Sequence, residues 1–225
     1  MKRLILIVSI TLVSISASSQ KDSATLLREV ETKLRDHAPV SSVLTDKTYV
    51  SLHPLVNFRE MVKKYSSSDV LNIAAKDEPG KKIKIVATIT DKDGKAVPDA
   101  MVYLYQTDYR GWYAGDAPHI LKNEGDYRHA RLFGYVKTDK QGKFELHTIK
   151  PAGYPQSDLP AHIHVQVTAG GYHAFGTEFL FQDDERLKGE ILNRAVIDGG
   201  MIAKPEKAES PFVQKFSYEI KLRKE

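Results

Sequence analysis

Two histidines one residue apart are the feature of this sequence with the clearest chemical potential. They lie in a Pro-Ala-His-Ile-His string over residues 160–164. Residues i and i+2 of a strand point to the same face, so His162 and His164 would project together while Ile163 and Val165 face an apolar core. Two imidazoles side by side form a natural pair of metal ligands. Such a pair alone more often belongs to two solvent-facing histidines, so further donors are needed.

Two tyrosines supply those donors. Tyr154 lies in a turn constrained by Gly153 and Pro155, and Tyr113 follows a strand and the turn at Gly111. Either tyrosine alone would usually be a packing aromatic. Together with the two histidines they suggest a distinct ligand set, because phenolate is a hard, anionic oxygen donor that favours ferric iron. A phenol has an ordinary pKa of about 10, so a cation must draw off its proton at neutral pH. A structural zinc site would more often use cysteine, and the chain has none.

Several short motifs accompany these four residues in a fixed order. They are Asp93-Gly94, Pro98, residues 102–108, Gly111-Trp112-Tyr113, Gly134-Tyr135, Thr138-Asp139, residues 142–144, residues 148–151, Tyr154-Pro155 and residues 160–164. Each piece is weak alone, but the ordered set resembles the intradiol ring-cleavage dioxygenases, the group that contains catechol and protocatechuate 3,4-dioxygenases. The resemblance extends over residues 70–185.

The resemblance implies that Tyr113, Tyr154, His162 and His164 bind one Fe(III), and that Trp112 lines the substrate pocket. A catechol would bind through both hydroxyls and displace one tyrosinate, which then serves as a base. O2 would be inserted into the aromatic ring, giving a muconate-type diacid. The implied partners are a small catecholic substrate and O2, with a possible homodimer built on the helical front segment. The amphipathic faces of that segment are equally consistent with packing on the chain's own main domain.

The sequence departs from the family pattern at two positions. Family members often carry an arginine before the Pro-Ala-His-Ile-His string, where this chain has Leu159, and a glutamine on the next strand, where it has Glu178. An arginine there would stabilise negative charge on the substrate, whereas a carboxylate would repel an acidic substrate or bind an extra hydroxyl or amine. Both residues are assigned to the pocket. Arg110, Arg128 and Arg131 are candidates for a replacement cation, and His119, His129, His147 and His173 are interpreted as surface or pocket groups.

The periodicity of the chain predicts the elements that would position these residues. Amphipathic helices are expected over residues 22–36 and 54–65, followed by linkers. From residue 81 the hydrophobic period changes to two, and turn signals separate the segments. Strands are expected over 83–89, 101–107, 133–138, 143–148, 162–168, 175–181 and 213–222. The expected fold is therefore all-β, an antiparallel, transthyretin-like (prealbumin-like) β-sandwich with a short N-terminal helical segment.

Composition and charge are those of an ordinary globular protein. The 225 residues are 41% hydrophobic and 28% charged, with a formal net charge of +4. A basic start, an apolar stretch and small residues predict an export signal over residues 1–20, and hence a periplasmic or secreted protein. Its removal would leave 31 basic (33 minus Lys2 and Arg3) and 29 acidic side chains, which argues against nucleic acid as a partner. No membrane partner is expected after removal.

The expected division is the signal at 1–20, a helical and linker segment at 21–79, and the dioxygenase-like domain at 80–225. The main functional hypothesis is a non-haem Fe(III)-dependent intradiol dioxygenase. The alternative is a non-catalytic transthyretin-like module that binds metal or another ligand without chemistry. Leu159 favours that alternative, whereas the four intact ligand positions favour the enzyme, because fold resemblance alone does not decide function. A third hypothesis is a structural domain that holds no metal.

Overall fold

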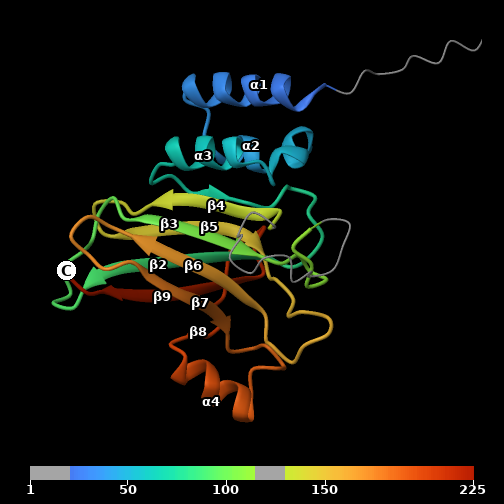
Figure 1. The fold of residues 1–225 in the computed structure, drawn as a ribbon. Helices are drawn as coiled ribbons and strands as arrows, with labels where there is room; N and C mark the ends of the chain where they lie inside the picture. The colour runs from blue at the N-terminus through green and yellow to red at the C-terminus, as the bar shows by residue number, and fades with distance from the viewer. Residues whose placement is uncertain (1–20, 115–129) are drawn as a thin grey trace, which may run out of the picture.

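The computed structural model describes residues 21–114 and 130–225, so the expected signal at 1–20, together with Arg128, His119 and His129, lies outside the described residues. The described chain is mostly sheet with a few helices (Figure 1). The helices are α1 (Ser23–Arg35), α2 (Ser41–Leu44), the short 3-10 helix η1 (Lys47–Leu52), α3 (Val56–Lys64) and α4 (Gly189–Ile197). The strands are β1 (Leu71–Asn72), β2 (Lys82–Asp91), β3 (Met101–Gln106), β4 (Leu132–Lys137), β5 (Lys143–Ile149), β6 (His162–Thr168), β7 (Phe175–Phe181), β8 (Met201–Ala203) and β9 (Gln214–Leu222).

The strands form two open sheets. One has the order β1-β5-β2-β9 and the other the order β4-β3-β6-β7-β8. Aromatic pairs join β7 of the second sheet to β9 of the first: Phe179 stacks on Tyr218 at 4.0 Å between ring centroids, and Phe181 meets the edge of Phe216 at 4.8 Å. The two sheets therefore pack face to face.

The expectation of a purely antiparallel arrangement is wrong for three pairings. β2–β5, β3–β4, β3–β6 and β6–β7 are antiparallel, but β1–β5, β2–β9 and β7–β8 are parallel. Parallel neighbours need long crossover connections, and each of these pairs is separated by a long stretch of chain. The β2–β9 pair, with register Ile83↔Gln214 through Asp91↔Leu222, is the longest of the three.

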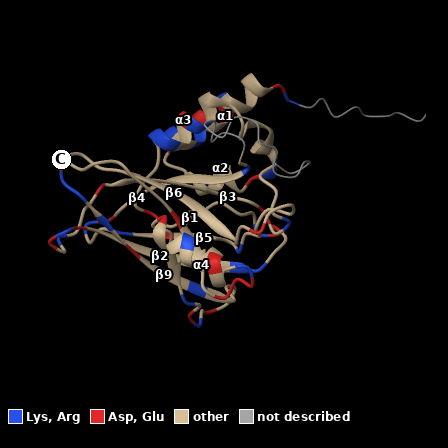
Figure 2. Cartoon of the chain, turned by 60° about the horizontal axis from the view of Figure 1, so that its bottom comes forward, with Lys and Arg blue, Asp and Glu red and all other residues tan. Residues whose placement is uncertain are grey.

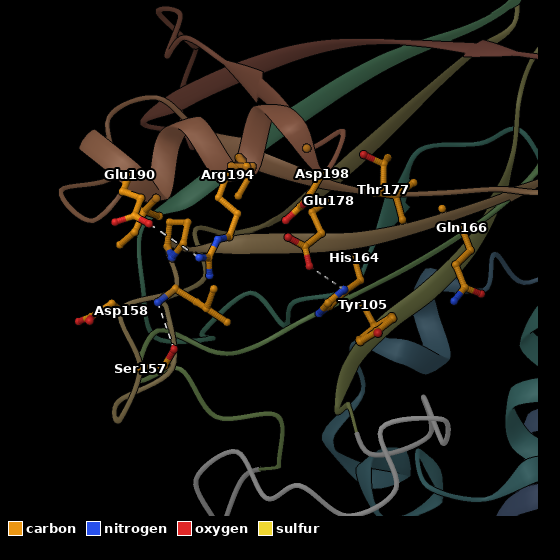
Figure 3. A pocket seen from close by; sticks show the side chains of 18 residues that line it. Tyr105, Ser157, Asp158, His164, Gln166, Thr177, Glu178, Glu190, Arg194 and Asp198 are labelled. Atoms are coloured by element: carbon orange, nitrogen blue, oxygen red, sulfur yellow. Dashed lines mark hydrogen bonds and ion pairs between the residues drawn. The ribbon is translucent and has the colours of Figure 1, made fainter.

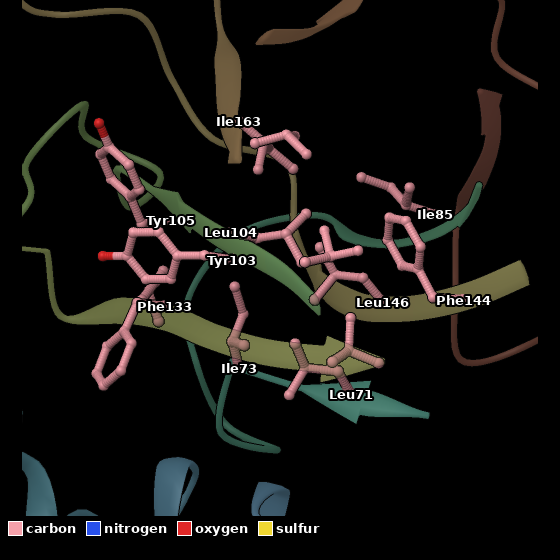
Figure 4. Close-up of a cluster of buried hydrophobic side chains, with 14 of the residues drawn as sticks. Leu71, Ile73, Ile85, Tyr103, Leu104, Tyr105, Phe133, Phe144, Leu146 and Ile163 are labelled. Carbon is pink, nitrogen blue, oxygen red and sulfur yellow. The ribbon is translucent and has the colours of Figure 1, made fainter. Parts of the chain in front are cut away.

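The core between the sheets comes from alternate residues of each strand (Figure 4). On β2 the odd-numbered positions from Ile83 to Ile89 are fully buried, as a period of two requires. On β3, Leu104 faces this core, whereas its neighbours Tyr103 and Tyr105 point to the opposite face of the sheet. β6 repeats the pattern, since Ile163 and Val165 are buried at 0% and 1% exposure. The opposite face of β3 and β6 is therefore left for aromatic and polar side chains.

The N-terminal helices cover the β4 side of the molecule (Figure 1). α1 begins at the cap residue Asp22, whose side chain accepts from Thr25 N, and it buries Leu26, Val30 and Leu34. The guanidinium of Arg59 on α3 is 3% exposed and donates to the Tyr103 hydroxyl at 2.9 Å. This contact ties the helical layer to the aromatic face of β3. No helix among the described residues combines the length and apolar character that crossing a membrane requires.

Candidate metal centre

The histidine pair lies on β6 as its spacing predicts. His162 and His164 project from the same face of the strand, with their Nε2 atoms 3.2 Å apart. Ile163 between them is fully buried on the other face. His164 also stacks on Tyr105 of the neighbouring β3, with ring centroids 4.4 Å apart and an interplanar angle of 14°. The histidines are thus held on a paired strand in the middle of the five-stranded sheet.

The two tyrosines come from loops that are bonded to each other. Asp108 closes the first loop by accepting from Gly111 N, and the same carbonyl accepts from Ala152 N of the second loop at 3.1 Å. The Thr107 hydroxyl donates to the Ala152 carbonyl at 2.7 Å. These bonds bring the segments before Tyr113 and Tyr154 together at the end of the sheet.

Two glycines allow this close approach of backbones. Gly111 has a φ of +83°, and a Cβ at this position would lie 2.4 Å from the carbonyl oxygen of Gly153. A Cβ on Gly153 would lie 2.2 Å from the Leu159 carbonyl oxygen. A side chain at Gly111 would push the two loops apart, and one at Gly153 would clash within the second loop, so glycine is required for steric reasons at both.

The four expected ligands meet in a closed ring of donor atoms. Tyr113 Oη lies 2.7 Å from Tyr154 Oη and 2.9 Å from His164 Nε2. Tyr154 Oη lies 3.1 Å from His162 Nε2, and the two histidine nitrogens complete the ring at 3.2 Å. Donors held about 2.1 Å from one ion at right angles lie about 3 Å from one another. The separations therefore fit a single metal ion.

The chemistry of this donor set suits a hard trivalent ion. It combines two phenol oxygens with two imidazole nitrogens and contains no thiol. Burial and the neighbouring Tyr154 hydroxyl raise the pKa of Tyr113 well above its ordinary value. Tyr113 is therefore a neutral phenol until a cation at the site stabilises its phenolate.

Acceptor atoms face the Nδ1 atoms of both histidines, so their Nε2 atoms point toward the tyrosine hydroxyls. His162 Nδ1 donates to the Pro160 carbonyl at 2.8 Å, which leaves Nε2 as the nitrogen with a lone pair. His164 Nδ1 lies 3.4 Å from Glu178 Oε1, a contact longer than an ordinary hydrogen bond. Glu178 is paired directly with His164 across β6 and β7, so both occupy the same face. His162, His164 and Glu178 form a group of described residues that could hold a metal ion.

A cavity of about 710 Å³ opens beside His164 (Figure 3). Of the three residues expected in a substrate pocket, Leu159 and Glu178 line this cavity and Trp112 does not. The backbone N–H of Trp112 donates to Asp108, and the Arg110 guanidinium lies 4.0 Å from the centre of its ring. Trp112 therefore packs within the loop that positions Tyr113.

The candidate replacement cations within the described residues do not line the cavity. Arg110 pairs with Asp108 at 2.7 Å, and Arg131 pairs with Glu78 at 2.6 Å. His147 bonds Glu145 and Asn72 on the other sheet, and His173 is exposed, so neither joins the site. The expectation that these two histidines are not ligands therefore agrees with their positions.

Sequence reasoning missed two residues that support the site. Tyr105 stacks on His164, and the pairing Tyr105↔His164 between β3 and β6 places them side by side. Arg186 Nη1 donates to the carbonyls of Tyr154, Ser157 and Leu159 at 3.0, 3.1 and 3.2 Å. Alternation along β3 puts Tyr105 on the histidine face, but only the strand register identifies its partner. No sequence signal indicates Arg186, because its partners are backbone atoms.

Comparison with known proteins was consistent with this geometry. A family model described as dioxygenase matches residues 57–224. Chlorocatechol 1,2-dioxygenase of Rhodococcus opacus is 27% identical over 131 residues, 51% of this chain and 49% of that protein. The protocatechuate 3,4-dioxygenase alpha chain of Burkholderia cepacia is 33% identical over 114 residues, 50% of this chain and 55% of that protein. The chain thus spans about half the length of these relatives.

A solved structure shares the fold. The dioxygenase domain of a dioxygenase carbohydrate-binding protein fusion from Streptomyces sp. SirexAA-E superposes with a TM-score of 0.54 and 20% identity. The match covers 71% of this chain and 90% of that one. At this identity the similarity describes the fold alone.

Proposed function

Because the chain belongs to the intradiol dioxygenase family, we propose that it inserts O2 into the ring of a catecholic substrate to give a muconate-type diacid. The single observation that supports this most strongly is the closed ring of donor atoms, with edges from 2.7 to 3.2 Å, formed by Tyr113, Tyr154, His162 and His164. We propose these four residues as the ligands of one Fe(III). The named relatives are themselves dioxygenases, and nothing in them favours the non-catalytic alternative.

A ferric ion held by these residues would bind the catechol oxygens and accept electron density from the ring. Side chains of the protein then accept protons and position the substrate. The phenol oxygens of Tyr113 and Tyr154 are the bases nearest to an incoming hydroxyl. Tyr113 is 4% exposed, whereas Tyr154 is only partly buried, so Tyr154 can turn away from the site at lower cost. We assign to Tyr154 the role of the base that receives a substrate proton at Oη.

The remaining side chains orient and shield the substrate. The fixed rings of His162 and His164 define the direction from which a ligand approaches, because each Nδ1 already faces an acceptor. Leu159 and Tyr105 line the cavity and offer apolar and aromatic surface to the ring of the substrate. Glu178 keeps His164 oriented, and its carboxylate lies within the space that a substituent on the substrate would occupy.

The visible spectrum, recorded beside the iron content, tests the proposal. Tyrosinate bound to ferric iron is expected to give a reddish colour with about one iron per chain. Tyr113→Phe and Tyr154→Phe should bleach the colour and lower oxygen uptake on catechol by about a hundredfold or more. Tyr109→Phe, at a tyrosine 49% exposed, is the matched control and should leave both unchanged. A chain that stays colourless after iron reconstitution contradicts the proposal.

We also propose the detailed fold class of the protein, its export and its oligomeric state. Two sheets packed face to face support a transthyretin-like sandwich, of mixed rather than purely antiparallel pairing. The pattern of residues 1–20 supports export, which cell fractionation would test. The family resemblance supports a homodimer built on the helical segment, which light scattering would test.

A further inference from the structure

The cavity beside His164 is much larger than a simple catechol requires. Its volume is about 710 Å³, within the range of about 300–1,000 Å³ that is typical of sites for drug-sized ligands. It begins at His164 and Tyr105 and extends between the face of β6 and β7, α4 and the loop at 157–160 (Figure 3). Of the four proposed ligands, His164 alone lines the cavity, so we place a ring bound at the metal centre next to this end and its substituent along α4.

Acidic side chains dominate the charged lining of this cavity. Four carboxylates line it, from Asp158, Glu178, Glu190 and Asp198. Among the described lining residues Arg194 is the one Lys or Arg, and it already pairs with Glu190 at 3.9 Å. The described part of the lining therefore has a formal charge of −3 with His164 neutral (four acidic minus one basic). Along the described chain as a whole, by contrast, Lys and Arg residues are interspersed with Asp and Glu residues (Figure 2).

One described arginine next to the cavity, Arg186, does not line it. Arg186 directs its guanidinium at the carbonyls of Tyr154, Ser157 and Leu159, behind the loop that borders the cavity. Hydrogen bonds to neutral carbonyls leave this charge in place, so Arg186 offsets part of the negative charge of the lining from outside the cavity. At the rim of the cavity Leu159 is apolar and 49% exposed.

We propose that the cavity selects catechols carrying a bulky substituent with a cationic group, such as an alkylammonium, and disfavours catechols carrying a carboxylate. This specificity rests on the proposed function. Opposite charges at the lining would attract the ammonium during encounter and in the complex, and a carboxylate would meet repulsion. Glu178 is the principal selector, because it lies 3.4 Å from the ligand residue His164 and therefore beside the reacting ring.

Solvent exposure determines how strongly each carboxylate favours a cationic substituent. The Glu178 side chain is 43% exposed and that of Glu190 is 91% exposed, so water and salt screen both charges. Each carboxylate is then expected to favour the cation by about two- to fivefold at low salt. Glu178 should contribute more than Glu190, because it lies deeper in the cavity. The preference should decline as ionic strength rises.

The test compares three catechols with nearly the same scaffold and different charge. Dopamine carries an ammonium, hydroxytyrosol a neutral hydroxyl and dihydroxyphenylacetate a carboxylate. Their dissociation constants for the iron-loaded full chain would be measured anaerobically by optical titration at low and high salt. Dopamine should bind most tightly and dihydroxyphenylacetate least. In Glu178→Gln, which keeps a side-chain oxygen near His164 Nδ1, the difference should shrink about two- to fivefold.

A matched control and a metal-free measurement separate this specificity from the reaction. Glu219→Gln removes the same charge from the exposed face of β9, on the other sheet, and should retain the preference. Calorimetry of the metal-free chain should show tighter binding of phenethylammonium than of phenylacetate. Cleavage of catechol with equal affinity for all charges would overturn the selectivity and leave the proposed function standing. A retained cation preference without cleavage of any catechol would support the selectivity and overturn the proposed function.

Discussion

At the scale of single residues, the orientation of each imidazole decides whether the four donors can bind one ion. His162 is fixed by the Pro160 carbonyl, which is backbone and present in any variant. His164 depends instead on the side chain of Glu178, 3.4 Å from its Nδ1. The second histidine is therefore the one whose orientation a single substitution can change.

We expect Glu178→Ala to lower the affinity for iron by about tenfold or more, because loss of the acceptor frees the His164 ring. Glu178→Gln should retain most of the affinity, since its amide oxygen can lie as near to His164 Nδ1 as the carboxylate does. Titration of the iron-loaded chain against a competing chelator measures both variants. Equal affinity in the wild type and in Glu178→Ala would show that Tyr105 alone, stacked at 4.4 Å, fixes the ring.

The period of two was sufficient to predict that His162 and His164 share a face, whereas the four ligand candidates came from the residue types together with the family resemblance. They could not predict that Glu178 lies opposite His164, because that pairing depends on how the turn between β6 and β7 sets the register. For the same reason, Trp112 was expected in the pocket but does not line the described cavity. Its direction depends on the φ of +83° at Gly111 immediately before it.

At the scale of elements, two loops position both tyrosines, and Gly111 sets the distance between them. Gly111→Ala should lower the free energy of unfolding by about 2 kcal/mol or more, since an L-residue at this φ is strained and its Cβ would lie 2.4 Å from the Gly153 oxygen. Iron binding should also be lost. Gly170→Ala, where a Cβ meets nothing within 4 Å, is the control for urea unfolding. Equal loss of stability in the two variants would count against this account.

The loop from Tyr154 to Leu159 depends on the Arg186 guanidinium, which donates to three of its carbonyls. Arg186→Gln should weaken iron binding and shift the tyrosinate colour, because Tyr154 loses its fixed position. Global stability should fall by only about 1–2 kcal/mol, the usual cost of unpaired backbone groups. Spectra and urea unfolding measure the two effects. Arg35→Gln, at an exposed arginine on α1, should change neither.

The strongly periodic elements were predictable, since α1, α3 and the long strands lie close to the expected ranges. β1, β8 and α4 were not predicted. β1 and β8 contain two and three residues, too few to show a period, and they exist because they pair with β5 and β7. None of the residues of α4 is buried, so burial of its own side chains does not determine where the helix lies. Yet α4 forms one wall of the cavity that holds the proposed specificity.

At the scale of the whole molecule, the helical layer and the sheets share one continuous core. Buried side chains from Leu26 and Phe58 on the helices join those of the strands in a single cluster. The junction includes a buried polar contact in which His53 Nδ1 donates to the Arg131 carbonyl at 2.7 Å. No sequence pattern indicated His53, because one histidine between two predicted helices is ordinarily exposed. The structure instead places it under Phe58 and Phe133.

His53 should therefore make the stability of the whole chain depend on pH. Its side chain is 3% exposed, its Nε2 has no hydrogen-bond partner among the described residues, and burial lowers its pKa from 6.5 to about 4. Between pH 6.5 and 4 the unfolded chain binds a proton at this histidine and the folded chain does not, so stability falls as pH falls. The loss should reach about 3 kcal/mol near pH 4. Urea unfolding across this window should show a flatter slope in His53→Gln than in the wild type, whereas the exposed control His173→Gln should keep the wild-type slope. Equal slopes in all three proteins would mean that the buried junction opens before His53 is protonated.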